Sequence, residues 1–425
     1  MPVILRKLPL VMFQPVYNRW LHWFALLTAL ATFCLVGIGG LVTSHGAGMA
    51  VPDWPTSYGY GMFFFPISQW VGGILYEHTH RLVASAVGVL VVALTRWLGG
   101  HSSRLPLAII GFGELLAGLL LVKLGGSWKG AGHFLSGIGG VVLLAALVWV
   151  RNAPARSPLP QWGWAAFGLV QIQGLLGGLR VVLFKDQIGI FHAALAQLFL
   201  LLLCAIALCT SRWWSENRRF DSVLNAAAGY RRLVLVTTCV ILGQLVLGAT
   251  MRHQHAGLAI PDFPAAYGRI WPAMDQASVA HYNQQRVETV GENPITSFQI
   301  ALQMAHRFIA LAIVVLVGVC AWRSRRELGS AHHLCKASSA WLALILGQII
   351  LGAATIWTNK AADIATVHVL IGAASLVFGG LMIVAQISNS ALSPIFQSSE
   401  AAETVTPCES SAFGDLAPAH TERVK

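Results

Sequence analysis

The chain alternates between long apolar stretches and short polar connections. Ten windows are each apolar over about twenty residues, which is the length that a helix needs to cross the ~30 Å hydrocarbon core of a bilayer. These windows are 20–43, 76–98, 104–123, 132–150, 161–182, 190–210, 232–251, 300–322, 338–357 and 365–388. The pattern predicts an all-α polytopic membrane protein with about ten transmembrane helices.

The composition supports this class and excludes several others. Of the 425 residues, 56% are hydrophobic and only 11% are charged, and the net charge is +11. The basic residues lie in the short connections between apolar windows, so they do not indicate a nucleic-acid partner. They are concentrated in the connections on the side of the N-terminus, which include Arg96–Arg104, Arg151–Arg156 and Arg212–Arg232. By the positive-inside rule, both termini are expected in the cytoplasm and the lipid bilayer is the expected surroundings.

Neither end of the chain is expected to pack. Residues 1–17 are read as a cytoplasmic N-terminal segment, and because no small-residue cleavage site follows, the first window is read as an uncleaved signal anchor. Residues 389–425 are polar and are predicted to form a disordered cytoplasmic tail. The seven cysteines are scattered without CxxC spacing, which argues against a disulfide framework or a thiolate metal site.

An internal repeat is the strongest signal in the sequence. Its matched pairs are Gly46–Pro55 with His255–Pro264 and Tyr58-Gly59 with Tyr267-Gly268, both at an offset of 209, then His80-Arg81 with His306-Arg307 at 226, Gln173–Gly178 with Gln348–Ala353 at 175, and His192 with His368 at 176. Self-similarity of this kind indicates that the two halves of the chain share one architecture.

The offsets also locate an insertion. The fall from 226 to 176 means that the first half holds about fifty extra residues, which two of the apolar windows fill as a helical hairpin at about 103–155. The remaining spans form two pseudo-symmetric four-helix bundles, one at 18–210 and the other at 228–388. Because four helices return the chain to the same side, both halves keep one orientation, and a pseudo-two-fold axis along the membrane normal is expected.

Four histidines occupy repeat-equivalent places on the second and fourth helix of each half, namely His80, His192, His306 and His368. In an up-down-up-down bundle those two helices are diagonal neighbours, and each histidine lies near the outer end of its helix. Two imidazoles that meet at one depth across a bundle can hold the iron of a flat macrocycle between them. A single membrane histidine can also simply bond a neighbouring helix or water, but four in register favour two bis-histidine heme sites near the outer face.

Two further polar residues belong to the inserted hairpin. His133 competes with His192 as a ligand, but only His192 follows a Gln-x-x-Leu-Gly helix as His368 does, so His133 is read as packing. Glu114 is an intramembrane carboxylate without a repeat partner, for which a function and a hydrogen bond to a neighbouring helix are both open.

The two halves differ at one position beside a histidine. Glu77 precedes His80 by three residues and so shares its helix face, whereas the counterpart before His306 is Gln303, which cannot exchange a proton. This difference favours one reacting half and one half that holds a fixed cofactor. A structural ion pair between Glu77 and Arg81 is the alternative.

The two arginines next to the histidines also have two candidate partners. Arg81 and Arg307 are each placed to bind either a heme propionate or the loop carboxylates of Asp53 and Asp262.

These motifs together resemble the heme A synthase family. The resemblance rests on Glu-x-x-His-Arg at Glu77–Arg81, the Pro-Asp-Trp-Pro loop at Pro52–Pro55, the repeated Gln-x-x-Leu-Gly helices and the four histidines, and it covers nearly all of 18–388 except the hairpin. It implies eight helices in two bundles. It also implies oxidation of the C8 methyl group of heme O to a formyl group through a hydroxymethyl intermediate, which gives heme A for cytochrome oxidase.

The resemblance further assigns residues and partners. It implies that His80, His192 and Arg81 bind the substrate heme O and that Glu77 takes part in its oxidation. It implies that His306, His368 and Arg307 bind a heme b that relays electrons. The expected partners are heme O, an electron donor for which a ferredoxin-like protein is one candidate, and heme O synthase. The expected location is a bacterial-type cell membrane.

This chain also departs from the family pattern. Many members carry a cysteine pair around the first Pro-Asp-Trp-Pro segment, where this chain has Val51 and Ser57, so a thiol role for that loop is excluded here. Other functions remain open, namely an electron-transferring membrane cytochrome b and a heme-handling transporter or chaperone. Transport is disfavoured because the polar groups gather near the outer surface and not at the midplane. A prenyltransferase is disfavoured because no paired Asp-rich diphosphate site exists.

Overall fold

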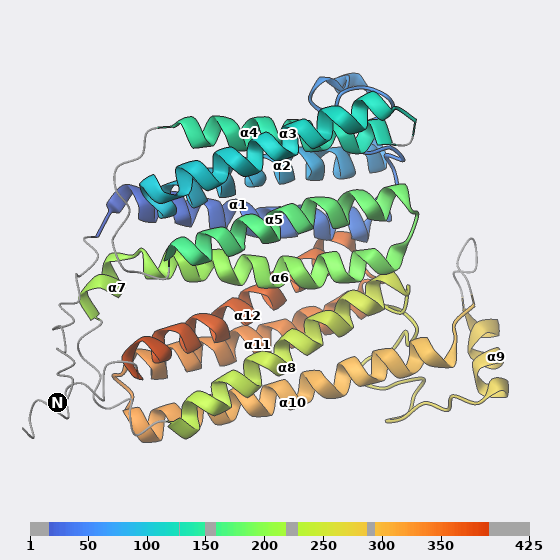
Figure 1. The fold of residues 1–425 in the computed structure, drawn as a ribbon. Coiled ribbons are helices and arrows are strands. Elements are labelled where there is room, and N and C mark those ends of the chain that lie inside the picture. Colours follow the sequence, from blue (N-terminus) through green and yellow to red (C-terminus); the bar gives the residue numbers. More distant parts are fainter. Residues whose placement is uncertain (1–16, 127, 149–158, 218–227, 287–293, 391–425) are drawn as a thin grey trace, which may run out of the picture.

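The computed structural model describes residues 17–126, 128–148, 159–217, 228–286 and 294–390, and within these ranges the regular structure is helical apart from two isolated β-bridges (Figure 1). The long helices are α1 (Arg19–Ser44), α2 (Gly72–Gly99), α3 (Arg104–Leu124), α4 (Trp128–Leu147), α5 (Leu159–Val182), α6 (Asp186–Cys209), α8 (Ala228–His253), α10 (Ser297–Leu328), α11 (His333–Trp357) and α12 (Ala362–Ser390). Short helices are α7 (Arg212–Asn217) and α9 (Gln276–Gln285). The predicted N-terminal segment and C-terminal tail lie almost entirely outside the described residues.

The all-α polytopic fold class is confirmed. Within the described ranges, nine stretches are long and apolar enough to cross a membrane. One of them, Gly72–Leu124, contains both α2 and α3, which are joined by a 3₁₀ turn at Gly100–Ser103, so every predicted apolar window corresponds to a helix. Several helices extend a few residues beyond the apolar window because polar caps begin them outside it. Thr296, for example, forms a capping box with Gln299 at the start of α10.

Helix contacts divide the long helices into two rings. The first ring is α1, α2, α5 and α6, and the second is α8, α10, α11 and α12, with each helix contacting the next and the last contacting the first. The rings meet where α1 and α6 pack against α12 and where α6 packs against α8. In each ring the second and fourth helices are therefore diagonal. The longest loops, 45–71 and 254–296, both lie at the same end of the rings (Figure 1).

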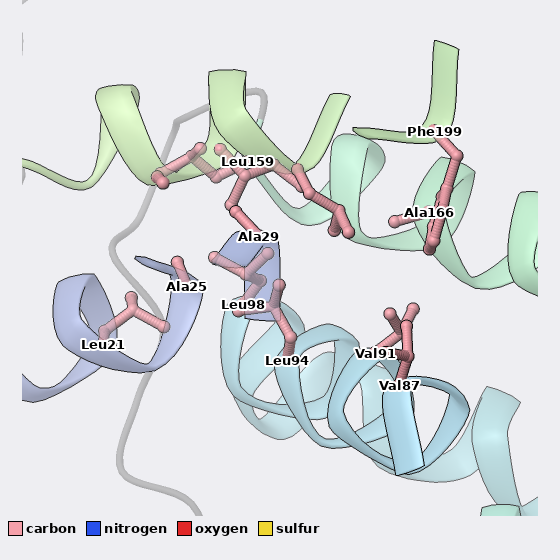
Figure 2. Close-up of a cluster of buried hydrophobic side chains, with 13 residues drawn as sticks. Leu21, Ala25, Ala29, Val87, Val91, Leu94, Leu98, Leu159, Ala166 and Phe199 are labelled. Carbon is pink, nitrogen blue, oxygen red and sulfur yellow. The ribbon is translucent and has the colours of Figure 1, made fainter. Parts of the chain in front are cut away.

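Each bundle has a solid apolar core at the end away from those loops. In the first bundle, Leu21 and Ala25 at the start of α1 meet Val91 and Leu98 late in α2, with side chains of α5 and α6 completing the cluster (Figure 2). In the second bundle the fully buried Trp341 near the start of α11 is part of the corresponding cluster. At the loop end, glycines lie against the histidines in both bundles, and in the second bundle two smaller apolar clusters pack the loop against the ends of α8 and α10.

Helices α3 and α4 pack on each other through glycines. A Cβ added at Gly111, Gly118, Gly132 or Gly139 would clash with the backbone of the facing helix. Small residues at these places let the two backbones approach closely, as is usual between helices in a membrane. The resulting hairpin lies against α2 outside the first ring, with Leu107 and Val142 buried in a shared cluster with Val92 and Phe167.

Candidate functional site

The four predicted histidines lie on the diagonal helices near the loop end. His80 is on α2 and His192 on α6, and their ring centroids are 6.5 Å apart with an angle of 73° between the ring planes. Two imidazoles bound to one metal through bonds of about 2 Å place their ring centroids about 6 to 6.5 Å apart. The spacing of this pair therefore suits two axial ligands of one iron.

Each histidine ring lies against a glycine on a neighbouring helix of its own bundle. The four glycines are Gly39 on α1 for His80, Gly177 on α5 for His192, Gly248 on α8 for His306 and Gly352 on α11 for His368. A Cβ added at any of them would stand 3.1–3.5 Å from the Cε1 atom of the ring. The glycines are equivalent in the repeat, by offsets of 209 and 175. At Gly39 and Gly352 an added Cβ would press on the imidazole at 3.1 Å, whereas at Gly177 and Gly248 it would make an ordinary van der Waals contact with the ring.

Three of the four histidines also receive a hydrogen bond at their backbone carbonyl. The donors are the Nε2 atoms of Gln173 to His192 O (3.2 Å), Gln244 to His306 O (2.9 Å) and Gln348 to His368 O (2.8 Å). Each glutamine precedes its glycine by four residues. At the equivalent place for His80 the chain has Leu35, which cannot donate.

Sequence reasoning missed part of this pattern. It noted Gln-x-x-Leu-Gly on α5 and α11 but not Gln244–Gly248 on α8. The sequence did contain a signal for Gln244–Gly248. This segment lies at the repeat offset of 209 from Leu35–Gly39, and the glycine is the same in both segments.

The ring nitrogens of all four histidines lack protein partners. The Nδ1 atom of each is buried without a hydrogen bond, and among the described residues no hydrogen bond engages any of the four Nε2 atoms. The four Nε2 atoms are not among the buried unpartnered atoms of the described residues, so Nε2 is the nitrogen of each ring that is left accessible to a metal. Four accessible imidazole nitrogens without a protein partner, at repeat-equivalent places, indicate a ligand. The four glycines that lie against the histidine rings, called the glycine seats below, and the unpartnered ring nitrogens suit axial ligation of a heme iron.

The two Pro-Asp-aromatic-Pro loops have the same hydrogen bonds. Asp53 accepts from the backbone nitrogens of Tyr58 (2.7 Å) and Gly59 (2.9 Å). Asp262 accepts in the same way from Tyr267 (2.7 Å) and Gly268 (2.9 Å). Burial would raise the pKa of Asp53, but hydrogen bonds from Gly59, Thr56 and Tyr58 outweigh it and lower the pKa below its usual value. Both carboxylates therefore organise their own loop.

The two arginines next to the histidines hold these loops by their backbone. Arg81 donates to the carbonyl oxygens of Asp53 (2.7 Å), Thr56 (3.0 Å) and Val51 (2.8 Å). Arg307 donates to those of Asp262 (2.7 Å) and Ala265 (2.8 Å). The loop partners of both arginines are thus carbonyl groups and not the aspartate carboxylates. Each loop is fixed to the residue that follows a candidate ligand.

Glu77 and Gln303 make one equivalent contact and differ in another. Glu77 accepts from the backbone nitrogen of Val51 (2.8 Å), as Gln303 does from that of Ile260 (2.7 Å). The second oxygen of Glu77 forms a buried ion pair with Arg81 at 2.7 Å. The amide nitrogen of Gln303 instead contacts the carbonyls of Gly257 and Ile260 at 3.3 Å. Both side chains therefore accept one backbone N–H of their loop, but only Glu77 brings a negative charge to this position.

The remaining polar residues lie apart from the pairs. His133 is exposed on α4. Glu114 accepts a hydrogen bond from Gln171 of α5 at 2.7 Å, while its other oxygen is buried without a partner. His78 is fully buried and bonds Ser57 at 3.1 Å. None of the three faces a histidine of the four.

Comparison with known proteins finds one family model and several similar heme A synthases. Residues 128–379, more than half of the chain, match a family model described as cytochrome oxidase assembly protein. The chain is similar to the heme A synthase of Alkalihalophilus pseudofirmus, with 23% identity over 86% of this chain and 96% of that one. It is also similar to the heme A synthase of Rhizorhabdus wittichii (24%, covering 84% and 90%) and to that of Geobacillus thermodenitrificans (25%, covering 83% and 86%).

Replacing a glycine seat should displace its histidine. We expect Gly352→Val to lower heme bound at the second pair by about tenfold or more, equal to at least about 1.4 kcal/mol, because the new side chain meets the His368 ring. Gly347→Val on the same helix is the control, since a Cβ there meets no atom within 4 Å. Heme content per chain and the low-spin absorbance of the purified proteins measure the effect. Equal heme content in Gly352→Val and Gly347→Val would contradict the inference that Gly352 makes room for the His368 ring.

Proposed function

The chain belongs to the family of cytochrome oxidase assembly proteins, and from this membership and its heme A synthase relatives we propose that it oxidises the C8 methyl group of heme O to the formyl group of heme A. Two successive hydroxylations of the methyl group, each consuming one dioxygen molecule, two protons and two electrons from the donor and releasing one water, would give a geminal diol, which loses water to form the aldehyde. The protein is a multi-pass membrane protein, so its apolar substrate and product can remain in the bilayer.

The first bundle is the proposed substrate half. One observation carries this assignment: beside the His80/His192 pair, whose ring centroids are 6.5 Å apart, the chain has the buried carboxylate Glu77 three residues before His80, where the second half has Gln303. His80 and His192 would hold the heme O iron from opposite faces and so fix the ring in the bundle. The substrate must enter and leave, and the missing glutamine at Leu35 makes His80 the least supported of the four ligands.

The second bundle is the proposed cofactor half. Here both histidines, His306 and His368, have glutamine donors at their carbonyls, and Gln303 adds no charge beside them. Heme b, when bound, would supply one-electron relay to the substrate half. The residues of this half would hold the ring in a fixed place and keep a titratable group away from it.

Glu77 is the proposed catalytic residue of the first half. Both of its oxygens are occupied, one by the Val51 backbone and one by Arg81, and its side chain is buried. A carboxylate held in this way is better suited to stabilise positive charge at a fixed place than to carry a proton away. Arg81 and Arg307 are the proposed partners of heme propionates, a role that they would combine with their hydrogen bonds to the loop carbonyls.

The remaining proposals concern surroundings and partners. Both termini would lie in the cytoplasm and both histidine pairs near the outer face, according to the distribution of basic residues. Heme O synthase would supply the substrate. An electron donor of the ferredoxin type would reduce the enzyme.

Co-expression with a heme O synthase tests the function directly. In cells with an active electron supply we expect extracted hemes to include the hydroxymethyl intermediate and heme A. His80→Ala and His192→Ala should abolish both products but keep low-spin heme b, whereas His306→Ala and His368→Ala should lose heme b. His133→Ala, at an exposed position, is the matched control. Persistence of unmodified heme O with the wild-type chain would leave an electron-transferring cytochrome b or a heme transporter as the function.

The charge at Glu77 can be tested by copying the second half into the first. Glu77→Gln keeps an acceptor for the Val51 backbone, as Gln303 shows for Ile260, but removes the charge. We expect both hemes to bind and the oxidation to slow by about 10²-fold. Gln303→Glu is the reciprocal control and should oxidise at the wild-type rate. An unchanged rate in Glu77→Gln would reduce Glu77 to a structural ion pair.

A further inference from the structure

The face of α5 that meets the inserted hairpin differs from the equivalent face of α11. At offset 175, Gln171, Gly174 and Gly178 of α5 correspond to Leu346, Ile349 and Ala353 of α11. In the second half Leu346 is 48% exposed, as expected for a side chain that meets lipid. In the first half Gln171 and Gly174 contact the hairpin, and Gly178 contacts Trp54 of the first loop. This face of α5 therefore meets protein, including at Gln171, the position where α11 has the exposed Leu346.

Besides the apolar cluster that packs the hairpin against α2 and Phe167, two contacts join it to this face of α5. Glu114 of α3 accepts from Gln171 at 2.7 Å. Phe134 of α4 lies over Gly174, where an added Cβ would stand 3.3 Å from the ring. Both contacts come from α5, which is the helix that seats His192 on Gly177.

The same phenylalanine reaches the first loop. The rings of Phe134 and Trp54 have centroids 4.3 Å apart. On its other side the Trp54 indole lies so close to Gly178 that any Cβ there would clash with it. Gly130 of α4 also approaches the Trp54 carbonyl oxygen, at 3.1 Å from an added Cβ. Trp54 is thus enclosed between α4 and α5.

Trp54 connects the hairpin to both histidines of the first pair. Gly178, beneath the indole, directly follows Gly177, the seat of His192. The neighbours of Trp54 in the loop, Asp53 and Thr56, accept through their carbonyls from Arg81, the residue after His80. From these contacts we propose that the α3–α4 hairpin positions loop 45–71 over the His80/His192 pair through Phe134 and Trp54. This rests on the proposed function of the first bundle as the substrate half.

The second loop is supported by other means. Phe263, the counterpart of Trp54, contacts Trp357, whose indole nitrogen donates to the Phe263 carbonyl at 3.3 Å. Tyr267 of the same loop stacks on Tyr282 of α9 at 3.6 Å. These supports come from within the second half. The hairpin is therefore a support added to the half whose ligand must exchange.

The hairpin packs against a loop, 45–71, that has no cysteine and so no disulfide to hold it. Val51 and Ser57 stand on either side of the Trp54 segment, so no disulfide can hold it. An aromatic contact keeps the loop in place and still lets it open, which suits a site that takes in substrate and releases product. Phe134 is therefore a positioning residue that sets how long heme O stays bound, while the oxidation step depends on Glu77.

Phe134→Ala in the full-length protein tests the proposal. We expect amide hydrogen exchange in loop 45–71 to accelerate by about tenfold or more, and heme O to dissociate faster by a similar factor. Amide hydrogen exchange in loop 254–296 and the low-spin heme b spectrum should stay unchanged. These two measurements are the control for correct folding of the variant. Phe134→Trp should restore slow exchange. The matched control is Trp357→Ala, which should loosen the second loop and leave the first as it is.

Two results would overturn the proposal: wild-type exchange in loop 45–71 of Phe134→Ala, or equal acceleration in both loops. If Phe134→Ala does not accumulate in the membrane, Phe134→Leu keeps an apolar side chain without the ring and is measured in the same way. The hydrogen-exchange result does not depend on oxidation. Failure of the wild-type chain to convert heme O would thus overturn the proposed function and leave this result to be judged separately.

Discussion

The contact between an imidazole and the bare backbone of a glycine sets the geometry of both bundles at the loop end. It occurs four times, at Gly39, Gly177, Gly248 and Gly352, and each time it joins a histidine helix to the helix beside it. Because there is no Cβ, two helices approach closely and the ring is held flat against one of them. The apolar clusters at the other end keep the bundle closed, so the spacing at the loop end is determined by these seats.

The loops complete each pair, and here the halves share a scaffold but not its charge. Arg81 and Arg307 both bind loop carbonyls, and Glu77 and Gln303 both accept one backbone N–H. The shared contacts explain why each position needs a long polar side chain with an acceptor oxygen. They do not explain the carboxylate, since glutamine provides the same anchor. The buried ion pair must offset its own desolvation, which the shared anchoring role does not require. A chemical role in one half gives a reason to retain it.

Much of this was predictable because the signals are long or repeated. Twenty-residue apolar windows located the helices, and the constant offsets placed His80, His192, His306 and His368 on diagonal helices before any coordinates were considered. The partners of Arg81 were not predictable, since a guanidinium can bind a carboxylate or a carbonyl and the loop fold decides which. Gln244 was missed for a different reason. Its motif is apparent only when the first and third helices of one half are compared, and Leu35 interrupts that pattern in the first half.

Under the proposed division into a substrate half and a cofactor half, the insertion gives each half of a symmetric scaffold its own loop support. A permanent cofactor needs a site that stays closed, and the second loop is held by Trp357 and by α9 from its own half. A substrate needs a site that opens, and its loop must be secured by contacts that can be broken without unfolding the bundle. Among the described residues, the hairpin contacts the first loop through Phe134 and Gly130, both of which lie against Trp54. In this proposal, breaking those contacts frees the first loop while the four-helix core and the packing of the hairpin on α2 stay intact.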